Sequence, residues 1–104
     1  MGEQPLELVV LLWAHPEKVD ALRRFEQQAV SIMAEHGGRL VHAVAPSATT
    51  AGGEPPTEVH VLSFRTRAGF EAYRADPRLA ALGPLRAEAI RETVVMSGTA
   101  VTYA

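Results

Sequence analysis

LELVVLLW, residues 6–13, is a short and nearly continuous apolar run that is rich in strand-forming side chains. Such a run is typical of a central strand whose two faces are both covered. We therefore expect residues 6–13 to form an inner strand of a sheet, with the remaining elements arranged around it.

An amphipathic helix is predicted directly after this strand. Apolar side chains recur at spacings of three and four at Val19, Leu22, Phe25, Ala29, Ile32 and Met33. Pro16 suits the first residue of such a helix, where a missing N–H costs nothing, and the helix would run for about five turns. Gly37-Gly38 provides the usual end signal, because a glycine just past the last turn can adopt a positive φ.

Three further strands are predicted at residues 39–45, 57–64 and 93–101. The small residues and the Gly-Gly and Pro-Pro pairs of residues 47–56 indicate a long loop between the first two of these strands. Thr66 is expected to cap a helix that Asp76-Pro77 ends, and Pro84 opens another helical turn before the last strand.

The order strand, helix, strand, strand, helix, strand indicates an α+β protein with the ferredoxin-like βαββαβ fold. Two right-handed βαβ units interleave into a four-stranded antiparallel sheet with the helices on one face. With 104 residues, the chain has room for a single domain, residues 1–104. Because the strands at 6–13 and 57–64 carry large apolar residues on both sides, the other face of the sheet would be apolar. A second copy should cover it in a homodimer.

Composition and charge limit the classes of partner. The net charge of −2 comes from 10 basic and 12 acidic residues of interspersed sign, which argues against a nucleic-acid partner. The chain has no cysteine, which favours a cytoplasmic location and leaves no thiolate metal site. Residues 1–5 lack a basic export signal and residues 6–14 are too short to span a bilayer, so we expect no membrane anchor. A small molecule or a second copy is the expected partner.

Several short elements of the chain resemble the dimeric α/β-barrel superfamily. They are His36-Gly37-Gly38-Arg39-Leu40, Val59 to Phe64, Phe70-Glu71-Ala72-Tyr73, Asp76-Pro77, Leu85-Arg86 and Gly98. The closest resemblance is to the small family DUF1330, a domain of unknown function. It implies a ferredoxin-like monomer whose sheet packs against that of a second copy to close a barrel with a pocket inside. The wider superfamily includes cofactor-free monooxygenases of antibiotic biosynthesis, haem-degrading enzymes and small cyclases or isomerases.

The chain departs from the DUF1330 pattern around Phe64. The family usually has an acidic residue just before this phenylalanine and a Pro-Ser pair after it, where this chain has Ser63 and Arg65-Thr66. A role as an acid therefore does not carry over to Ser63.

His42 and His60 are the candidate catalytic residues. If the hairpin between their strands is centred near Ala51, residues whose numbers sum to 102 lie opposite each other, which pairs His42 with His60 on one face. Histidine suits proton transfer near neutral pH. The competing interpretation is that each ring only makes structural hydrogen bonds. A metal site is not expected, because two histidines without a nearby carboxylate are too few ligands.

Trp13, Tyr73 and Arg86 are the candidate substrate-binding residues. Trp13 could stack on a ligand or fill the dimer interface. Tyr73 could polarise a carbonyl group, and Arg86 could hold a carboxylate or enolate. The alternative is that Tyr73 packs its ring under the sheet, while Arg86 pairs with Glu88, Glu92 or an acid of the second copy.

Two functions stay open at this point. The first is a small-molecule enzyme or binding protein without a cofactor, whose pocket supports oxygenation, isomerisation or cyclisation of an aromatic or polyketide-like compound. The second is a non-catalytic dimeric module that senses a ligand or accompanies stress responses. An open pocket with His42 or His60 pointing into it favours the first, and a plugged interior favours the second.

Overall fold

The computed structural model describes residues 4–104, so the first three residues of the segment examined for an export signal lie outside the described residues. Along the chain the elements are β1 (Leu6–Ala14), α1 (Val19–Ala34), β2 (Gly38–Val44), β3 (Glu58–Phe64), α2 (Arg67–Arg74), α3 (Pro77–Ala81), α4 (Gly83–Ala89) and β4 (Ile90–Gly98). Within residues 4–104 no helix combines the length and the apolar character that a membrane crossing requires.

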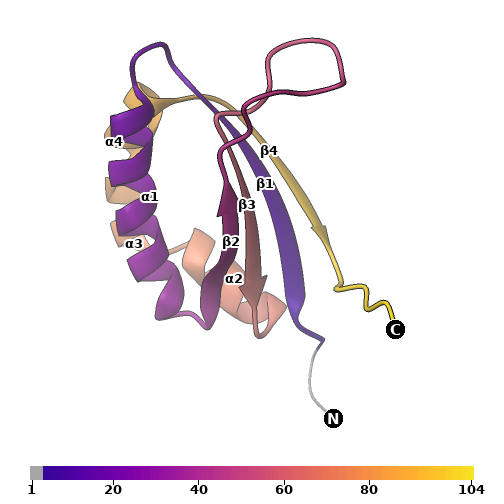
Figure 1. Cartoon of the computed structure of the whole chain (residues 1–104). Coiled ribbons are helices and arrows are strands. Elements are labelled where there is room, and N and C mark those ends of the chain that lie inside the picture. Colours follow the sequence, from indigo (N-terminus) through magenta and orange to yellow (C-terminus); the bar gives the residue numbers. More distant parts are fainter. Residues whose placement is uncertain (1–3) are drawn as a thin grey trace.

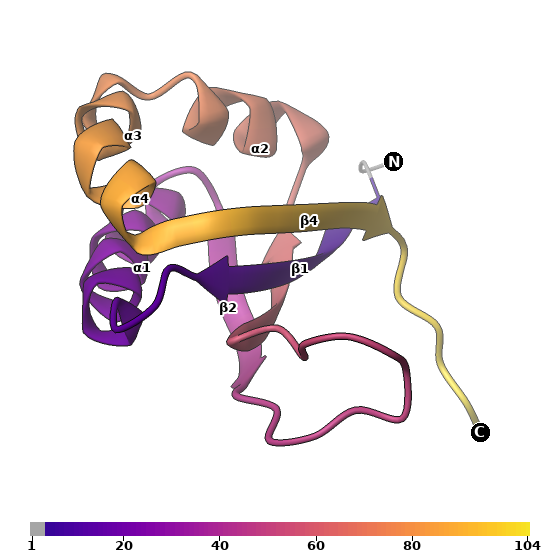
Figure 2. The ribbon, with the colours of Figure 1, turned by 90° about the horizontal axis from the view of Figure 1, so that it is seen from above.

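The four strands form one sheet in the order β2-β3-β1-β4, and each neighbouring pair is antiparallel. All helices lie on the same side of this sheet, as Figure 1 and Figure 2 show. The predicted ferredoxin-like βαββαβ fold is therefore confirmed, with β1 as an inner strand between β3 and β4.

The core lies between the sheet and the helices. In β1 the side chains of Leu6, Leu8 and Leu12 are buried, because every second residue of a strand points to the same face. The helix α1 covers them with one apolar stripe, formed by Ala21, Leu22, Phe25, Ala29, Ile32 and Met33. This alternation fixes which strand residues reach the space under the helices.

The helices differ in detail from the sequence prediction. The helix α1 starts at Val19 and not at Pro16, because Glu17 has a φ of 65° and a helix cannot continue through that conformation. Gly37 has a φ of 77°, as the end signal predicts. Pro77, which the sequence predicts to end the preceding helix, is also the first residue of α3. Asp76 caps α3, because its side chain accepts a hydrogen bond from the backbone N–H of Arg78.

The predicted register between β2 and β3 is wrong. Ala43 pairs with His60, while His42 pairs with Val61, and a bulge between Leu40 and His42 shifts the ladder. A shift of one residue sends a side chain to the opposite face. The rings of His42 and His60 consequently lie on opposite sides of the sheet.

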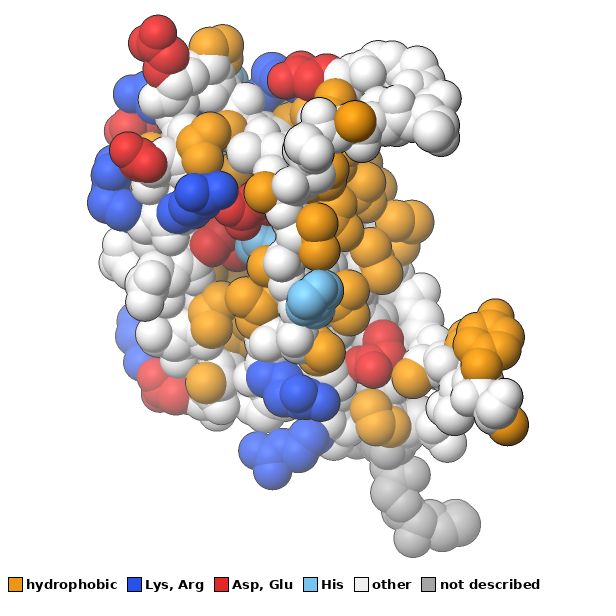
Figure 3. Space-filling model, viewed as in Figure 1, with side chains coloured by type: hydrophobic (Ala, Val, Ile, Leu, Met, Phe, Trp, Pro, Cys, Tyr) orange, Lys and Arg blue, Asp and Glu red, His pale blue; other side chains and the backbone are white. Residues whose placement is uncertain are grey.

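The face of the sheet away from the helices, called the open face below, is apolar. The exposed apolar side chains on it include Val9 (36% exposed), Val44 (45%), Val94 (37%) and Met96 (49%). The loop of residues 45–57 and the C-terminal residues 99–104 project beyond this face (Figure 1, Figure 2). Figure 3 shows hydrophobic side chains gathered between these two projections. In a monomer these apolar side chains would be exposed to water, which is unfavourable in free energy.

Candidate functional site

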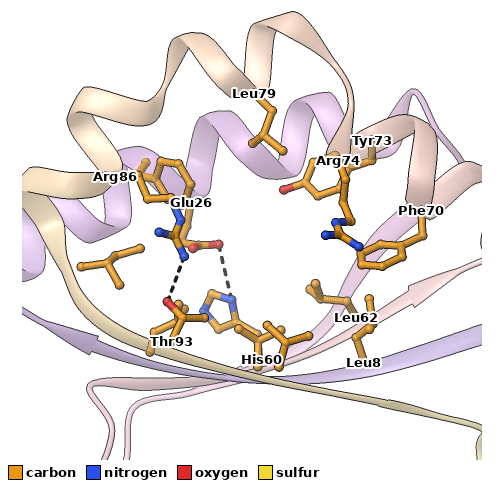
Figure 4. A pocket seen from close by; sticks show the side chains of 15 residues that line it. Leu8, Glu26, His60, Leu62, Phe70, Tyr73, Arg74, Leu79, Arg86 and Thr93 are labelled. Atoms are coloured by element: carbon orange, nitrogen blue, oxygen red, sulfur yellow. Dashed lines mark hydrogen bonds and ion pairs between the residues drawn. The ribbon is translucent and has the colours of Figure 1, made fainter.

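A cavity of about 330 Å³, called the main pocket below, lies between the sheet and the helices (Figure 4). Its size falls in the range of small-molecule sites. Most of its wall is apolar, with side chains from the sheet and from the helix layer such as Leu8, Phe25, Leu62, Phe70 and Leu79. A ligand here would be held mainly by apolar contact.

One end of the main pocket is polar. Glu26 from α1, His60 from β3, Arg86 from α4 and Thr93 from β4 meet there and are called the polar end below. Arg86 donates a hydrogen bond from Nη2 to Thr93 Oγ1 at 3.0 Å. Glu26 Oε2 lies 3.5 Å from His60 Nδ1, as the dashed line in Figure 4 marks. Four separate elements thus bring an acid, a base and a cation to one point.

The strand pattern explains why His60 reaches this place. In β3 the side chains of Glu58, His60 and Phe64 all point under the helices and are at most 9% exposed, whereas those of Val59 and Val61 point to the open face. His60 is only 3% exposed. A buried imidazole needs hydrogen-bond partners, and the neighbouring carboxylates supply them.

Glu58 is the stronger of the two partners of His60. The distance from His60 Nε2 to Glu58 Oε1 is 2.8 Å, and Arg23 Nε donates to Glu58 Oε2, also at 2.8 Å. Burial alone would raise the pKa of Glu58, but the hydrogen bonds from His60 and Arg23 hold that pKa below its usual value. Because Glu58 is ionised, it accepts the Nε2–H proton of His60. We therefore assign to neutral His60 the form in which Nδ1 presents a lone pair towards Glu26.

Glu26 has a raised pKa, which suits a group that takes up and releases a proton. Burial raises the pKa of Glu26, and the charge of Glu58 adds to this, while His60 and Arg86 oppose it. A carboxyl group with a raised pKa exchanges its proton closer to neutral pH. Buried carboxyl groups of this kind are common at sites of acid–base chemistry.

The opposite end of the main pocket is aromatic. Figure 4 shows the hydroxyl group of Tyr73 directed into the cavity, with Phe70 and Arg74 beside it. Burial raises the pKa of Tyr73 to about 12, with a contribution from the charge of Glu26. This hydroxyl group therefore keeps its proton and remains a hydrogen-bond donor. The Arg74 guanidinium lies 5.5 Å from the centre of the Phe70 ring, a cation–π contact.

The structure brings three of the five predicted site residues together. His60, Tyr73 and Arg86 line the main pocket, whereas His42 and Trp13 lie on the open face. The indole N–H of Trp13 donates to the backbone oxygen of Glu54 in the loop at 3.1 Å. In residues 4–104 no group of three or more histidine, cysteine or acidic side chains is arranged to hold a metal ion.

Sequence reasoning missed Glu26 and Glu58. Glu58 lies two residues before His60, and this spacing places both side chains on one face of a strand. Glu26 directly follows the buried Phe25 and so borders the apolar stripe of α1. The spacing of Glu58 and the position of Glu26 can both be read from the sequence. Glutamates on a protein surface often have the same spacing or position, so neither feature identifies a site residue by itself.

Solved structures with the same fold include proteins of different descriptions. A protein of unknown function from Rhodopseudomonas palustris superposes with a TM-score of 0.84 at 15% identity, over 97% of this chain and 85% of that one. A dimeric ferredoxin-like protein of unknown function from Thermobifida fusca gives a TM-score of 0.66 at 16% identity, over 94% and 92%. SnoaB, a cofactor-independent oxygenase from Streptomyces nogalater, gives 0.72 at 11% identity, over 96% of each chain. These likenesses show the fold.

A family assignment comes from the sequence itself. No curated protein matches the chain. The profile of DUF1330, described as a domain of unknown function, matches residues 10–99, which include β1 from Val10 onwards and every later element. This confirms the resemblance drawn from the sequence motifs. The chain belongs to the DUF1330 family and has the fold of the dimeric α/β-barrel proteins.

Proposed function

We propose that this chain acts as a homodimer in which each main pocket binds an aromatic or polyketide-like small molecule and removes a proton from it. Such a step begins cofactor-free oxygenation, isomerisation or cyclisation of an acidic C–H or phenol compound. One observation carries the proposal. The buried His60 and the partly buried Glu26 lie together at one end of a largely apolar cavity, with Arg86 beside them.

The residues of the pocket suit successive parts of this reaction. The apolar wall holds the ring system, and the Glu26–His60 pair takes the proton. The electron pair of the broken bond stays on the ligand as an enolate or phenolate, and Arg86 offers that anion a positive charge. Tyr73 adds a hydroxyl donor from the other end of the cavity.

The fold relatives support this chemistry without assigning it. SnoaB is described as a cofactor-independent oxygenase and shares the architecture. The alternative of a non-catalytic sensing module anticipates a plugged interior. An open cavity with His60 in its wall favours the enzyme or binding protein.

Two observations support the homodimer: the apolar open face and a fold relative that is described as dimeric. Pairing two open faces would remove Val9, Val94 and Met96 from water. Trp13 and His42 would then belong to the interface and not to the catalytic group.

Alizarin, a hydroxyanthraquinone whose visible absorbance changes when its phenol ionises, tests the proposal. We expect wild-type protein to bind alizarin and to shift it towards the phenolate at a pH where the free dye is neutral. Arg86→Leu should weaken this shift, and Glu26→Gln together with His60→Gln should abolish it. Arg24→Leu is the matched control, because Arg24 is an exposed arginine of α1 outside the main pocket. Failure of wild-type protein to bind the dye, or binding of the neutral phenol alone, would contradict the proposal.

A further inference from the structure

A second cavity, called the second hollow below, lies between α1 and the β2–β3 edge of the sheet and has a volume of about 420 Å³. Its rim is exposed and is formed by Arg23, Gln27, Ser31 and Ala43. Figure 3 looks onto this side of the molecule, where acidic and histidine side chains are visible in a recess next to a basic one. The second hollow is thus open to solvent.

Glu26 and His60 line both cavities. They stand between the main pocket, whose wall is largely apolar, and the second hollow, which is bordered by polar side chains from α1. A group that contacts two separate cavities can exchange a proton with each of them. The Glu26–His60 pair can therefore face a ligand in the main pocket and water in the second hollow.

We propose that the second hollow is the water-side end of a proton path, through which the proton taken up by the Glu26–His60 pair leaves the protein. The proposal rests on the proton abstraction proposed above. The proton of the ligand moves to the Glu26 carboxylate, while its bonding electrons stay on the ligand. The O–H proton of Glu26 then passes to water in the second hollow, either directly or by way of a transient protonation of His60 Nδ1. Glu26 is again a carboxylate, and the step needs no oxidant or reductant.

Glu58 is the positioning residue of this path. It accepts from His60 Nε2 at 2.8 Å, and this contact turns Nδ1 towards Glu26. A proton on Nδ1 would make an imidazolium between Glu58 and Glu26, two groups that can balance its charge. Arg23 holds the second oxygen of Glu58 and, with 57% of its side chain exposed, links the path to the surface. The path thus runs from the main pocket to solvent past Glu26, His60 and Glu58.

Exchange of the His60 ring N–H proton with water tests the path in ligand-free protein. The rate is measured by NMR on protein labelled with ¹⁵N in histidine, and His60→Gln identifies the signal. Ala43→Phe and Ser31→Phe each place a large ring in the second hollow without touching the main pocket. We expect each to slow exchange by about tenfold, equivalent to ~1.4 kcal/mol in the barrier.

Two matched variants complete the experiment. Val95→Phe adds the same ring at the main pocket, and Ala34→Phe adds it on an exposed part of α1 outside both cavities. Both should leave the exchange rate of His60 nearly unchanged. If Val95→Phe slows exchange while the two second-hollow variants do not, water reaches His60 through the main pocket and the proton path is wrong. Unchanged backbone spectra establish that each variant is folded. Because no ligand is used, this outcome is separate from the alizarin result.

Discussion

The Nε2 atom of His60 lies 2.8 Å from Oε1 of Glu58, two residues earlier on the same strand. Both side chains project under the helices, where Glu26 approaches the other ring nitrogen. A histidine and two carboxyl groups therefore share a space that is mostly apolar. Their ionisation should be visible in the stability of the protein.

Glu26→Gln should stabilise the protein at neutral pH. Because the pKa of Glu26 is raised in the folded state, the folded chain holds a proton that the unfolded chain loses above about pH 4.3, so stability falls as pH rises through that window. Glutamine has no charge to bury, so the variant avoids the cost of ionising this side chain in the folded state. We expect its free energy of unfolding to exceed that of the wild type by ~1 kcal/mol at pH 7 and by less at pH 4. Urea unfolding at both pH values measures it. Glu71→Gln on the exposed side of α2 is the control, and a loss of stability at pH 7 would contradict the prediction.

Glu58→Gln should have the opposite effect and destabilise the protein at neutral pH. The pKa of Glu58 is lowered in the folded state, so its contribution is present above about pH 4.3 and is lost as pH falls through the folded value. Loss of the charged partner of His60 and Arg23 should cost ~2 kcal/mol at pH 7. The same urea experiment should show that acid destabilises the variant less than the wild type. An equal response to acid would show that Glu58 does not carry this dependence.

Tyr73 should resist ionisation until about pH 12, because partial burial in the wall of the main pocket raises the pKa of its hydroxyl group. Its raised pKa contributes stability that is present below about pH 10 and is lost as pH rises towards 12. The chain has 2 tyrosines, and Tyr103 is 90% exposed. Absorbance titration of Tyr103→Phe therefore isolates Tyr73. Ionisation of this variant near pH 10 would mean that the Tyr73 hydroxyl is open to water.

Val61→Glu should prevent dimer formation. Val61 pairs with Val9 in the centre of the open face, where a charge would be buried against the second copy. Light scattering during gel filtration should find aggregate or an unstable monomer in place of the dimer, whereas Ala72→Glu on α2 should leave the dimer intact. Val10 does not offer the same test, since it lines the main pocket. A folded wild-type monomer of 11.2 kDa would refute the dimer.

Gly38→Ala should destabilise the fold by ~2 kcal/mol, a typical cost of overpacking a core. A Cβ atom at Gly38 would clash with the side chains of Met33 and Phe64. Gly52→Ala is the matched control, because a Cβ atom there has nothing within 4 Å. Thermal unfolding should give a lower melting temperature for Gly38→Ala than for Gly52→Ala. Equal melting temperatures would show that the core can accommodate a Cβ atom at Gly38.

The strands and the main helix could be predicted because their signals are local. The apolar run that forms β1 specifies an inner strand, and the spacing from Val19 to Met33 in α1 specifies a helix and its buried side. The site depends on contacts between distant elements. The bulge after Leu40 moved His42 to the open face, and no composition signal marks it. Glu26 acquires its raised pKa only when the helix packs on the sheet.

The chain contains one tryptophan, and its indole N–H is bonded to the loop at Glu54 beside the open face. Indole emission depends on the polarity around the ring. The natural fluorescence of Trp13 will therefore report loop displacement and association of two copies, with no label attached to the protein.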